Sequence, residues 1–431
     1  MLLSACLIVK DEEENLVSCL ASLSRLVDEV VIYDTGSTDD TLGVARREAE
    51  RWKLPLTLVE GYWNDDFARA RNASLEHCAG IWVLWIDADE VAVCDDPRDL
   101  HYHLDSLPDP PEGPDAVMVR VTDLPEAASA SVVRYSSPRL FRRVRCHWVD
   151  RLHEQVRVRG EDSLPVVVGT DHLQLHAAGH DGRTIAERGK LERNIRIAQA
   201  ALDDEGGVRF RARALVNLGR TLWGAGRPEE ARAAFEESLA EQDAGRLDRR
   251  FAFEGLTFIH VGCSRWEEAE RCLAGLWHAC ELPTAPLYLR SVLTLRRGLA
   301  EEDPAERKKL LRGAIDYALK LPSDAVDDDG TGFGPDRISL VVAEALAGLG
   351  DFASAAATCL EALAAGYMGV KMDLLLHWLD RAGVDPAILA DAIPPWLAAP
   401  FCTQLREVSG GAAAVAILTR LAERWPDQRS V

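Results

Sequence analysis

The chain has 431 residues, of which 47% are hydrophobic and 28% are charged, and its formal net charge is −21. These values are typical of a globular protein with two or three domains, and the acidity argues against nucleic acid or an anionic membrane as the main partner. No apolar run reaches the roughly 18 residues of a membrane span, and the ten cysteines include no C-x-x-C pair. We therefore expect a cytoplasmic protein with reduced thiols that is not a membrane protein.

Residues 1–195 alternate apolar runs with helical patterns, which predicts an α/β domain with a mostly parallel sheet. Strands are expected at residues 5–9, 30–33, 56–60, 81–86, 116–121 and 166–168. After about residue 200 the pattern changes, because alanine, leucine and charged residues then recur at helical spacing.

Two of the expected strands end in acidic residues. The strand at 81–86 runs into Asp87-Ala88-Asp89-Glu90, and the strand at 30–33 is followed by Asp34-Thr35-Gly36-Ser37-Thr38-Asp39-Asp40-Thr41. Like charges at the end of a buried strand are costly to desolvate, and a bound divalent cation would offset that cost. Asp39 and Asp40 are expected to cap a helix that begins near Thr41.

Four motifs occur in the order of a known family. They are Lys10-Asp11-Glu12-Glu13-Glu14-Asn15-Leu16, the turn at 34–41, Ala70-Arg71-Asn72 at the start of a helix, and the aspartates at 87 and 89. Together they resemble the family 2 glycosyltransferases, which are inverting nucleotide-sugar enzymes with a GT-A fold; Asp11 stands where that family usually has asparagine. The resemblance implies an α/β GT-A (Rossmann-like nucleotide-binding) domain at residues 1–200. It also implies a nucleotide-diphosphate sugar as donor, a UDP-sugar in the first place, and Mn²⁺ or Mg²⁺ as cofactor.

The same resemblance implies which residues hold the donor. Asp89 would be a metal ligand, with Asp87 beside it or bonded to the ribose. Asp34 would contact the nucleoside, Arg71 would bind a phosphate, and Glu12 of the first motif would belong to the same donor-binding set. The alternatives are a turn-forming role for Asp34 and a structural salt bridge for Arg71.

Further candidates lie downstream of the aspartates. His153-Glu154 resembles an H-E element of family members that carry helical repeats, and these two residues are the expected catalytic pair. Glu154 would deprotonate the acceptor, with Asp150 as the rival base and a structural ion pair as the alternative. His176 is expected to complete the metal site with Asp89, the alternative being an ordinary core histidine.

Basic residues suggest a second set of contacts. Lys190 and Arg193 belong to a K-x-x-R-N pattern that could reach the diphosphate or could join the two domains. Eight arginines lie between residues 134 and 159 beside only two acids, which suits an anionic ligand, or else a solvated face. His101 and His103 are expected to be surface residues.

Residues 201–431 are expected to form an all-α domain of tetratricopeptide (TPR)-like helical repeats. Leu218-Gly219, Gly226, Ala231 and Phe235 fall at the offsets of that repeat, in which small residues let two helices approach and Phe235 fills the gap. The block at 327–330, Asp-Asp-Asp-Gly, resembles a calcium loop, but aligning its glycine puts Ala325 at the first ligand position. We therefore interpret the block as an acidic linker.

These features favour an inverting glycosyltransferase whose repeats hold a peptide or protein acceptor. The architecture resembles the bacterial peptide S-glycosyltransferases of the glycocin type. A lipopolysaccharide-core or cell-surface glycan is the alternative acceptor, and a repeat scaffold with an inactive transferase domain is the alternative of another class. The sequence leaves open the sugar, the nucleotide base, the linkage and the oligomeric state.

Overall fold

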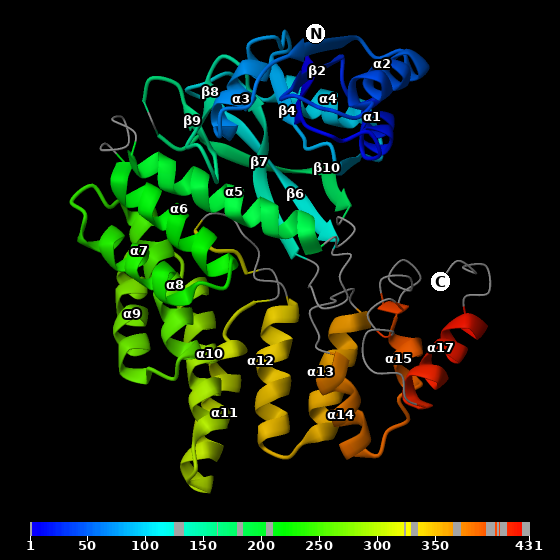
Figure 1. Cartoon of the computed structure of the whole chain (residues 1–431). Coiled ribbons are helices and arrows are strands. Elements are labelled where there is room, and N and C mark those ends of the chain that lie inside the picture. The colour runs from blue at the N-terminus through cyan, green and yellow to red at the C-terminus, as the bar shows by residue number, and fades with distance from the viewer. Residues whose placement is uncertain are drawn as a thin grey trace. The chain divides into compact units, whose positions relative to one another are not determined.

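The chain divides into two compact units in this computed structural model, which describes residues 2–124, 133–161, 163–178, 184–203, 210–322, 325–328, 335–364, 372–393, 401–402, 405 and 412–424. The first unit contains the described residues up to 203 apart from Val133, and the second contains those from 210 onward (Figure 1). The predicted division between residues 200 and 201 falls inside helix α5 (Thr184–Asp203), which belongs to the first unit. We therefore propose a domain boundary after residue 203.

The first unit is built on a mixed sheet with helices on both faces (Figure 1). Its other elements, in chain order, are β1 (Leu3–Val9), α1 (Leu16–Leu23), β2 (Glu29–Asp34), α2 (Thr41–Trp52), β3 (Leu56–Glu60), α3 (Phe67–Leu75), β4 (Trp82–Trp85), β5 (Glu90–Val93), α4 (Pro97–Ser106), β6 (Ala116–Leu124), β7 (Val133–Arg142), β8 (Cys146–Val149), β9 (Gln155–Val158) and β10 (Val167–Ala178). The predicted order of an α/β domain followed by an all-helical domain is confirmed.

The strand order in the sheet is β3-β2-β1-β4-β7-β6-β10-β5, and β8 and β9 form a separate two-stranded ribbon. β1 lies parallel to β2 and β4, β2 to β3, and β6 to β10, whereas β7 and β5 pair antiparallel with β4 and β10. The six predicted strands are present, but β5, β7, β8 and β9 were not predicted. β5, β8 and β9 have only four residues each, and β7 and β9 carry arginines that hide the apolar alternation.

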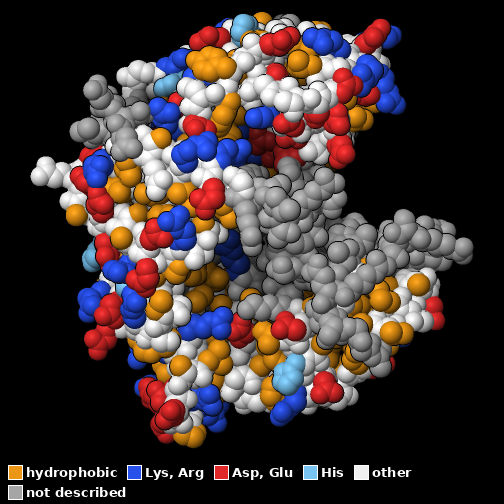
Figure 2. Space-filling view, viewed as in Figure 1, with side chains coloured by type: hydrophobic (Ala, Val, Ile, Leu, Met, Phe, Trp, Pro, Cys, Tyr) orange, Lys and Arg blue, Asp and Glu red, His pale blue; other side chains and the backbone are white. Residues whose placement is uncertain are grey.

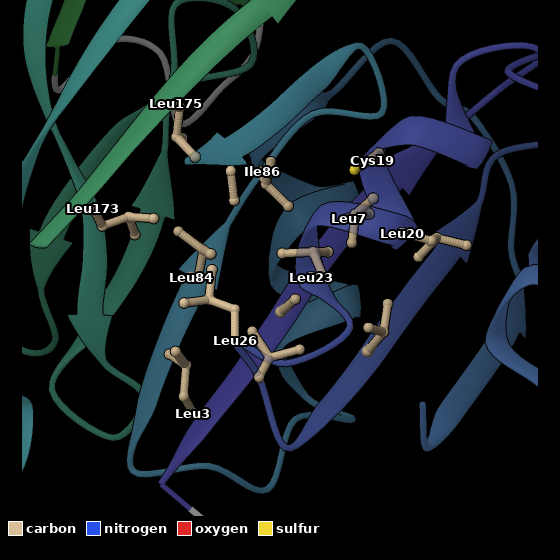
Figure 3. Close-up of a cluster of buried hydrophobic side chains, with 14 of the residues drawn as sticks. Leu3, Leu7, Cys19, Leu20, Leu23, Leu26, Leu84, Ile86, Leu173 and Leu175 are labelled. Atoms are coloured by element: carbon tan, nitrogen blue, oxygen red, sulfur yellow. The ribbon is translucent and has the colours of Figure 1, made fainter. Parts of the chain in front are cut away.

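The central strands are buried on both faces, which is why they appear in the sequence as continuous apolar runs. Leu3 and Leu7 of β1 belong to one buried hydrophobic cluster with Leu20 and Leu23 of α1 (Figure 3). Cys6, between them, packs on the opposite face with α3 and the β8–β9 ribbon. All ten cysteines are free.

The second unit consists of helices that pack in consecutive pairs, α6 with α7, α8 with α9, α10 with α11 and α12 with α13 (Figure 1). Its helices are α6 (Arg211–Gly224), α7 (Pro228–Ala240), α8 (Arg246–Gly262), α9 (Trp266–Ala279), α10 (Thr284–Ala300), α11 (Pro304–Ala318), α12 (Pro335–Gly348), α13 (Phe352–Ala364), α14 (Met372–Ala382), α15 (Ile388–Ala392) and α17 (Ala412–Arg424). Among the described residues, no helix combines the length and the apolar character that crossing a membrane requires.

Phe235 of α7 fills the space between two neighbouring helices, as the repeat offsets predict. A Cβ atom at Gly219 of α6 would lie 2.7 Å from Cε1 of Phe235, and one at Gly255 of α8 would also overlap that ring. Only glycine lets both helices approach the buried aromatic ring this closely.

Two aspartates of the acidic linker after α11 have partners elsewhere in the second unit. Asp327 is 5% exposed and forms an ion pair with the buried Arg250 of α8. Asp328 pairs with Arg246 at 2.8 Å and accepts a hydrogen bond from the backbone N–H of Glu281 at 2.8 Å. The two carboxylates therefore fasten this segment across the helices, because buried charges need partners.

Candidate functional site

The predicted acidic residues lie at the carboxyl edge of the parallel strands, where open α/β sheets bind ligands. Asp34 is the last residue of β2 and pairs in register with Val9 of β1. Its carboxylate accepts hydrogen bonds from the N–H groups of Gly36 and Ser37 at 3.1 Å and from the Ser37 hydroxyl at 2.5 Å. The turn-forming role is thus visible in the structure, and contact with a nucleoside stays a prediction.

The loops after β1 and β2 are bonded to each other. The N–H of Thr38 donates to Oδ1 of Asp11 at 2.6 Å, and the N–H of Glu12 donates to the Thr41 hydroxyl at 2.8 Å. Asp11 has a φ of 56°, a left-handed conformation that Asp and Asn adopt more readily than most residues. The Glu12 carboxylate accepts a bond from Asn15 at 2.8 Å. The loops after β1 and β2 are therefore held together at the carboxyl edge of the sheet.

One of the two acids expected to cap α2 does not do so. Asp39 accepts the N–H of Thr41 at 3.0 Å, which satisfies a donor in the first turn of the helix. Asp40 makes no capping hydrogen bond, and its carboxylate instead pairs with Arg47 at 2.7 Å.

A tight turn after β4 carries the two aspartates. The Asp87 N–H donates to the Glu90 carboxylate at 2.9 Å, and the Glu90 N–H donates to the Asp87 carbonyl at 3.0 Å. Glu90 also receives both terminal nitrogens of the buried Arg139, at 2.8 and 2.9 Å. Burial raises the pKa of Glu90, and Arg139 acts in the opposite direction. Glu90 therefore shapes the turn that presents Asp87 and Asp89.

Arg71 of α3 joins the turn to the predicted catalytic loop. Its Nε donates to Glu154 at 2.7 Å and its Nη2 donates to Asp87 at 2.9 Å. Burial alone would lower the pKa of Arg71, but the two carboxylates raise it above its ordinary value. Two guanidinium groups lie near the indole of Trp85, that of Arg71 at 4.5 Å and that of Arg139 at 3.6 Å from the ring centroid. Arg71 is thus engaged in the structural salt bridge that was the alternative to phosphate binding.

Helix α3 also holds strand β8 and the loop after it through hydrogen bonds to their backbone groups. The Asn72 amide donates to the Trp148 carbonyl at 2.8 Å and accepts the Trp148 N–H at 3.0 Å. The N–H of Phe67 donates to the carbonyl of Arg151 at 2.9 Å. Two residues of the loop, Asp150 and His153, have φ values of 71° and 55°. Left-handed conformations outside glycine cost energy and persist where the surrounding structure enforces them, often at functional sites.

Three residues of the arginine-rich region bond to acidic side chains, and one of them also bonds to a backbone carbonyl. Arg139 belongs to the buried pair with Glu90, and Arg142 donates to Asp109 and to the carbonyl of Pro114. Arg145 pairs with Asp115 at 3.1 Å. These three arginines have structural partners, and an anionic ligand for the arginine-rich region stays a prediction.

The remaining predicted residues are spread over three elements. His176 lies on β10 opposite Val91 of β5, one residue from the buried Leu175. Because side chains alternate along a strand, its imidazole is on the other face of the sheet from Leu175. Arg193 of α5 places its guanidinium 5.5 Å from the Phe67 ring, and burial lowers its pKa. Lys190 is on the same helix, with a side chain outside the described residues.

The H-x-H pair is not fully at the surface, contrary to prediction. His101 lies with Nε2 at 2.7 Å from the carbonyl oxygen of Leu26, and the ring of His103 lies 5.4 Å from that of His172. Both are half-buried. In the described part of the chain, no group of three or more His, Cys, Asp or Glu side chains is placed to hold a metal ion.

Residues 4–111 match the model of glycosyl transferase family 2. The chain contains a family 2 glycosyltransferase domain. TPR repeat-containing protein Synpcc7942_0270 of Synechococcus elongatus is 38% identical over 140 residues, which are 32% of this chain and 31% of that protein. The predicted combination of this domain with TPR-like repeats is confirmed.

Two other relatives are glycosyltransferases by name. The SPbeta prophage-derived glycosyltransferase SunS of Bacillus subtilis is 29% identical over 20% of this chain and 19% of its own length. The lipopolysaccharide core biosynthesis glycosyltransferase LpsC of Rhizobium meliloti is 37% identical over 20% of this chain and 32% of its own. The matches thus span a third or less of these curated relatives. Among solved structures, S. aureus TarS 1–349 in complex with UDP-GlcNAc is similar, with 15% identity, coverage of 69% of this chain and 92% of that one, and a TM-score of 0.38.

Sequence reasoning missed four residues that organise the site: Trp85, Glu90, Arg139 and Asn72. Glu90 was visible as the last acid of the motif, but its partner is 49 residues away. Asn72 was noted only as part of a motif, and its contact with Trp148 spans 76 residues. Such pairings depend on where strand β7 and the β8–β9 ribbon lie, which the local pattern does not specify.

Proposed function

We propose that this chain is an inverting glycosyltransferase that moves a sugar from a nucleotide-diphosphate sugar, a UDP-sugar in the first place, to an acceptor. The observation that carries the proposal is the cluster in which Arg71 joins Asp87 to Glu154 at the ligand-binding edge of the sheet. The exposed fractions of the three side chains are 6%, 37% and 15%. The buried guanidinium of Arg71 therefore fixes two carboxylates that remain within reach of a ligand.

The donor side is the turn at 87–90. Mg²⁺ commonly takes one or two carboxylates and completes its shell with substrate phosphates and water. Asp89, with Asp87 beside it, fits such a partial site for Mg²⁺ or Mn²⁺, and His176 is a further proposed ligand. The cation, when bound, would neutralise charge on the leaving diphosphate. Asp34 and Glu12 remain the proposed contacts with the nucleoside.

The acceptor side is the β8–β9 loop. Glu154 would take the proton of a hydroxyl or thiol while that oxygen or sulfur attacks the anomeric carbon and the bond to the diphosphate breaks. Arg71 orients the carboxylate through its 2.7 Å bond, and the strained His153 beside it directs the loop. Asp150 is the rival base on the same loop.

For the acceptor we propose a peptide or protein segment held by the helical repeats, because stacked repeats form extended concave surfaces. A glycan is the second candidate, and the 37% identity to LpsC favours it. Purified chain incubated with a nucleotide sugar and either a peptide library or lipopolysaccharide core would distinguish them by which product gains the mass of a sugar.

Release of nucleoside diphosphate from a panel of nucleotide sugars, with Mg²⁺, Mn²⁺ or a chelator, tests the transferase itself. Asp89→Asn should lower the rate by about a hundredfold or more, because a metal contributes several kcal/mol to the transition state. Asp99→Asn on the exposed side of α4 is the matched control. Full activity in chelator would remove the metal from the proposal, and failure of every nucleotide sugar to bind or react would contradict the function.

A further inference from the structure

The loop between β3 and α3, residues 61–66, is pressed against the end of β2. The N–H of Gly61 donates to the Asp34 carbonyl at 2.9 Å, and the N–H of Tyr62 donates to the Tyr33 hydroxyl at 3.2 Å. A Cβ atom at Gly61 would overlap the Tyr33 ring, so only glycine permits this approach. The start of the loop is therefore fixed to the strand that carries Asp34.

The other end of the loop is fixed as well. The indole of Trp63 donates to Asp65 at 2.8 Å, and Arg196 of α5 donates two hydrogen bonds to the same carboxylate at 3.0 and 3.1 Å. Asp66 caps α3 by accepting the N–H of Arg69 at 2.8 Å. A loop held at both ends presents its remaining side chains in a defined orientation.

Tyr62 is the aromatic side chain that this loop exposes. It is 60% exposed, and one face of its ring lies 3.9 Å from the guanidinium carbon of Arg69. Arg69 donates to Asn64 Oδ1 at 2.6 Å, to the Tyr33 hydroxyl at 3.3 Å and to the carbonyl of Tyr62. These acceptors are neutral, and within the described residues Arg69 forms no ion pair. The guanidinium thus braces the inner face of the ring and leaves the outer face to solvent.

The sheet order relates this ring to the aspartates. From β4, which precedes Asp87 and Asp89, the order runs through β1 and β2 to β3. Three strand spacings amount to about 14 Å, a span that an extended nucleoside diphosphate covers. With the diphosphate at the aspartates, the base would therefore reach the loop after β3.

We propose that the outer face of Tyr62 is the stacking platform for the nucleobase of the donor, and that Arg69 is a positioning residue that holds the ring. This inference rests on the proposed function and adds a specific contact to it. Every base has a flat π-face, so stacking supplies affinity while leaving the choice of base to other contacts.

Titration calorimetry with UDP, uridine and pyrophosphate tests the platform. Tyr62→Ala should weaken the binding of UDP and of uridine by about 5- to 150-fold, and should leave pyrophosphate unchanged. Tyr62→Phe, which keeps the ring, should bind within about twofold of the native chain. Tyr102→Ala is the matched control, because Tyr102 is 78% exposed on α4.

Arg69→Met tests whether Arg69 positions the ring of Tyr62. A loss of similar size for uridine and UDP supports positioning of the ring, whereas a loss confined to UDP would assign Arg69 to the phosphates and overturn that part. If Tyr62→Ala folds with a native melting temperature and binds UDP normally, the platform is wrong while the transferase proposal stands. If the native chain binds none of UDP, GDP, ADP or CDP, both fall.

Discussion

Two regions of the molecule, the candidate site of the first unit and helix α7 of the second, use arginine differently. In the first, Arg71 and Arg139 are 6% and 3% exposed on their side chains and bond to carboxylates at the candidate site. In the second, helix α7 carries Arg232, which is 31% exposed and pairs with glutamates on its own helix. Figure 2 shows basic and acidic side chains interleaved over the helices of the second unit. Buried ion pairs are costly to desolvate, whereas exposed pairs contribute about 0–1 kcal/mol.

Burial of charge does not by itself mark a functional site. Arg250 of the second unit is also buried, and its partner Asp327 is 5% exposed. That pair fastens a segment to a helix. Arg71 differs because it serves two carboxylates on separate loops, and Asp87, the more exposed of them, can still meet a ligand. A buried arginine that bonds two carboxylates, one of which is still accessible to a ligand, is therefore a better indicator of a functional site than a buried ion pair alone.

The largest effect is expected from Glu154→Gln. Glutamine keeps an oxygen for Arg71 but cannot take a proton, so transfer to the acceptor should fall about 10²–10⁴-fold while donor binding survives. Glu161→Gln, on the exposed turn after β9, is the control. Mass spectrometry of the glycosylated product measures the rate of transfer in both variants. A variant that still transfers at half the native rate would move the base elsewhere, first to Asp150.

Arg71→Met should be the most destabilising change in the site. It leaves Asp87 and Glu154 without their shared cation, and removal of one partner from a buried pair typically costs about 3–5 kcal/mol. Arg271→Met in the second unit, where the arginine side chain is 69% exposed, should cost about 1 kcal/mol at most. Denaturant midpoints compare the two directly. Equal losses of stability in the two variants would contradict the distinction between the buried arginine of the candidate site and the exposed arginine of the second unit.

Gly219→Ala should destabilise the repeats without affecting the donor site. The added methyl group meets the ring of Phe235, and overpacking of this kind costs about 1–3 kcal/mol. Gly224→Ala on the same helix has open space at the Cβ position and serves as the control. Thermal unfolding and UDP affinity are the two measurements. Weakened UDP binding in Gly219→Ala alone would show that the units are energetically coupled.

The smallest expected effect is on how the stability of the fold depends on pH. Hydrogen bonding to Arg196 lowers the pKa of Asp65 below its ordinary value of 3.8. The folded state therefore binds this proton less readily than the unfolded state, so the contribution is fully present above about pH 4 and is lost as pH falls through the folded pKa. Because Arg196 is 63% exposed, the gain should not exceed about 1 kcal/mol. Urea midpoints between pH 2.5 and 6 should fall less steeply in Asp65→Asn; identical slopes would contradict the assignment.

The parts of the fold that could be predicted follow from local pattern. Continuous apolar runs indicated strands buried on both faces, and the carboxyl ends of parallel strands necessarily share an edge, which brought Asp34 and Asp87 together. The antiparallel strand β7 could not be predicted, because its alternation is broken by arginines whose partners are distant. Arg139 was therefore seen only as one member of a basic region, although it braces the motif through Glu90.

The candidate site was predicted in its residue types more than in its contacts. Arg71 and Glu154 were both named, but their mutual bond joins residues 83 apart and follows from the packing of α3 against the β8–β9 loop. His176 and Asp89 were expected to share a metal, a placement that depends on the register between β5 and β10. Sequence indicates which side chains carry chemistry, whereas register decides which of them meet.

Helix α5 has a consequence for anyone who wishes to recombine this protein. It follows the sheet in the chain and precedes the repeats, so a designer might assign it to either module. Its Arg196, however, is bonded to the loop after β3. A chimera that receives foreign repeats before residue 184 would lose that anchor, whereas a graft between residues 204 and 209 would keep it. The proposed acceptor-holding repeats could then be exchanged while the first unit keeps all of its own contacts.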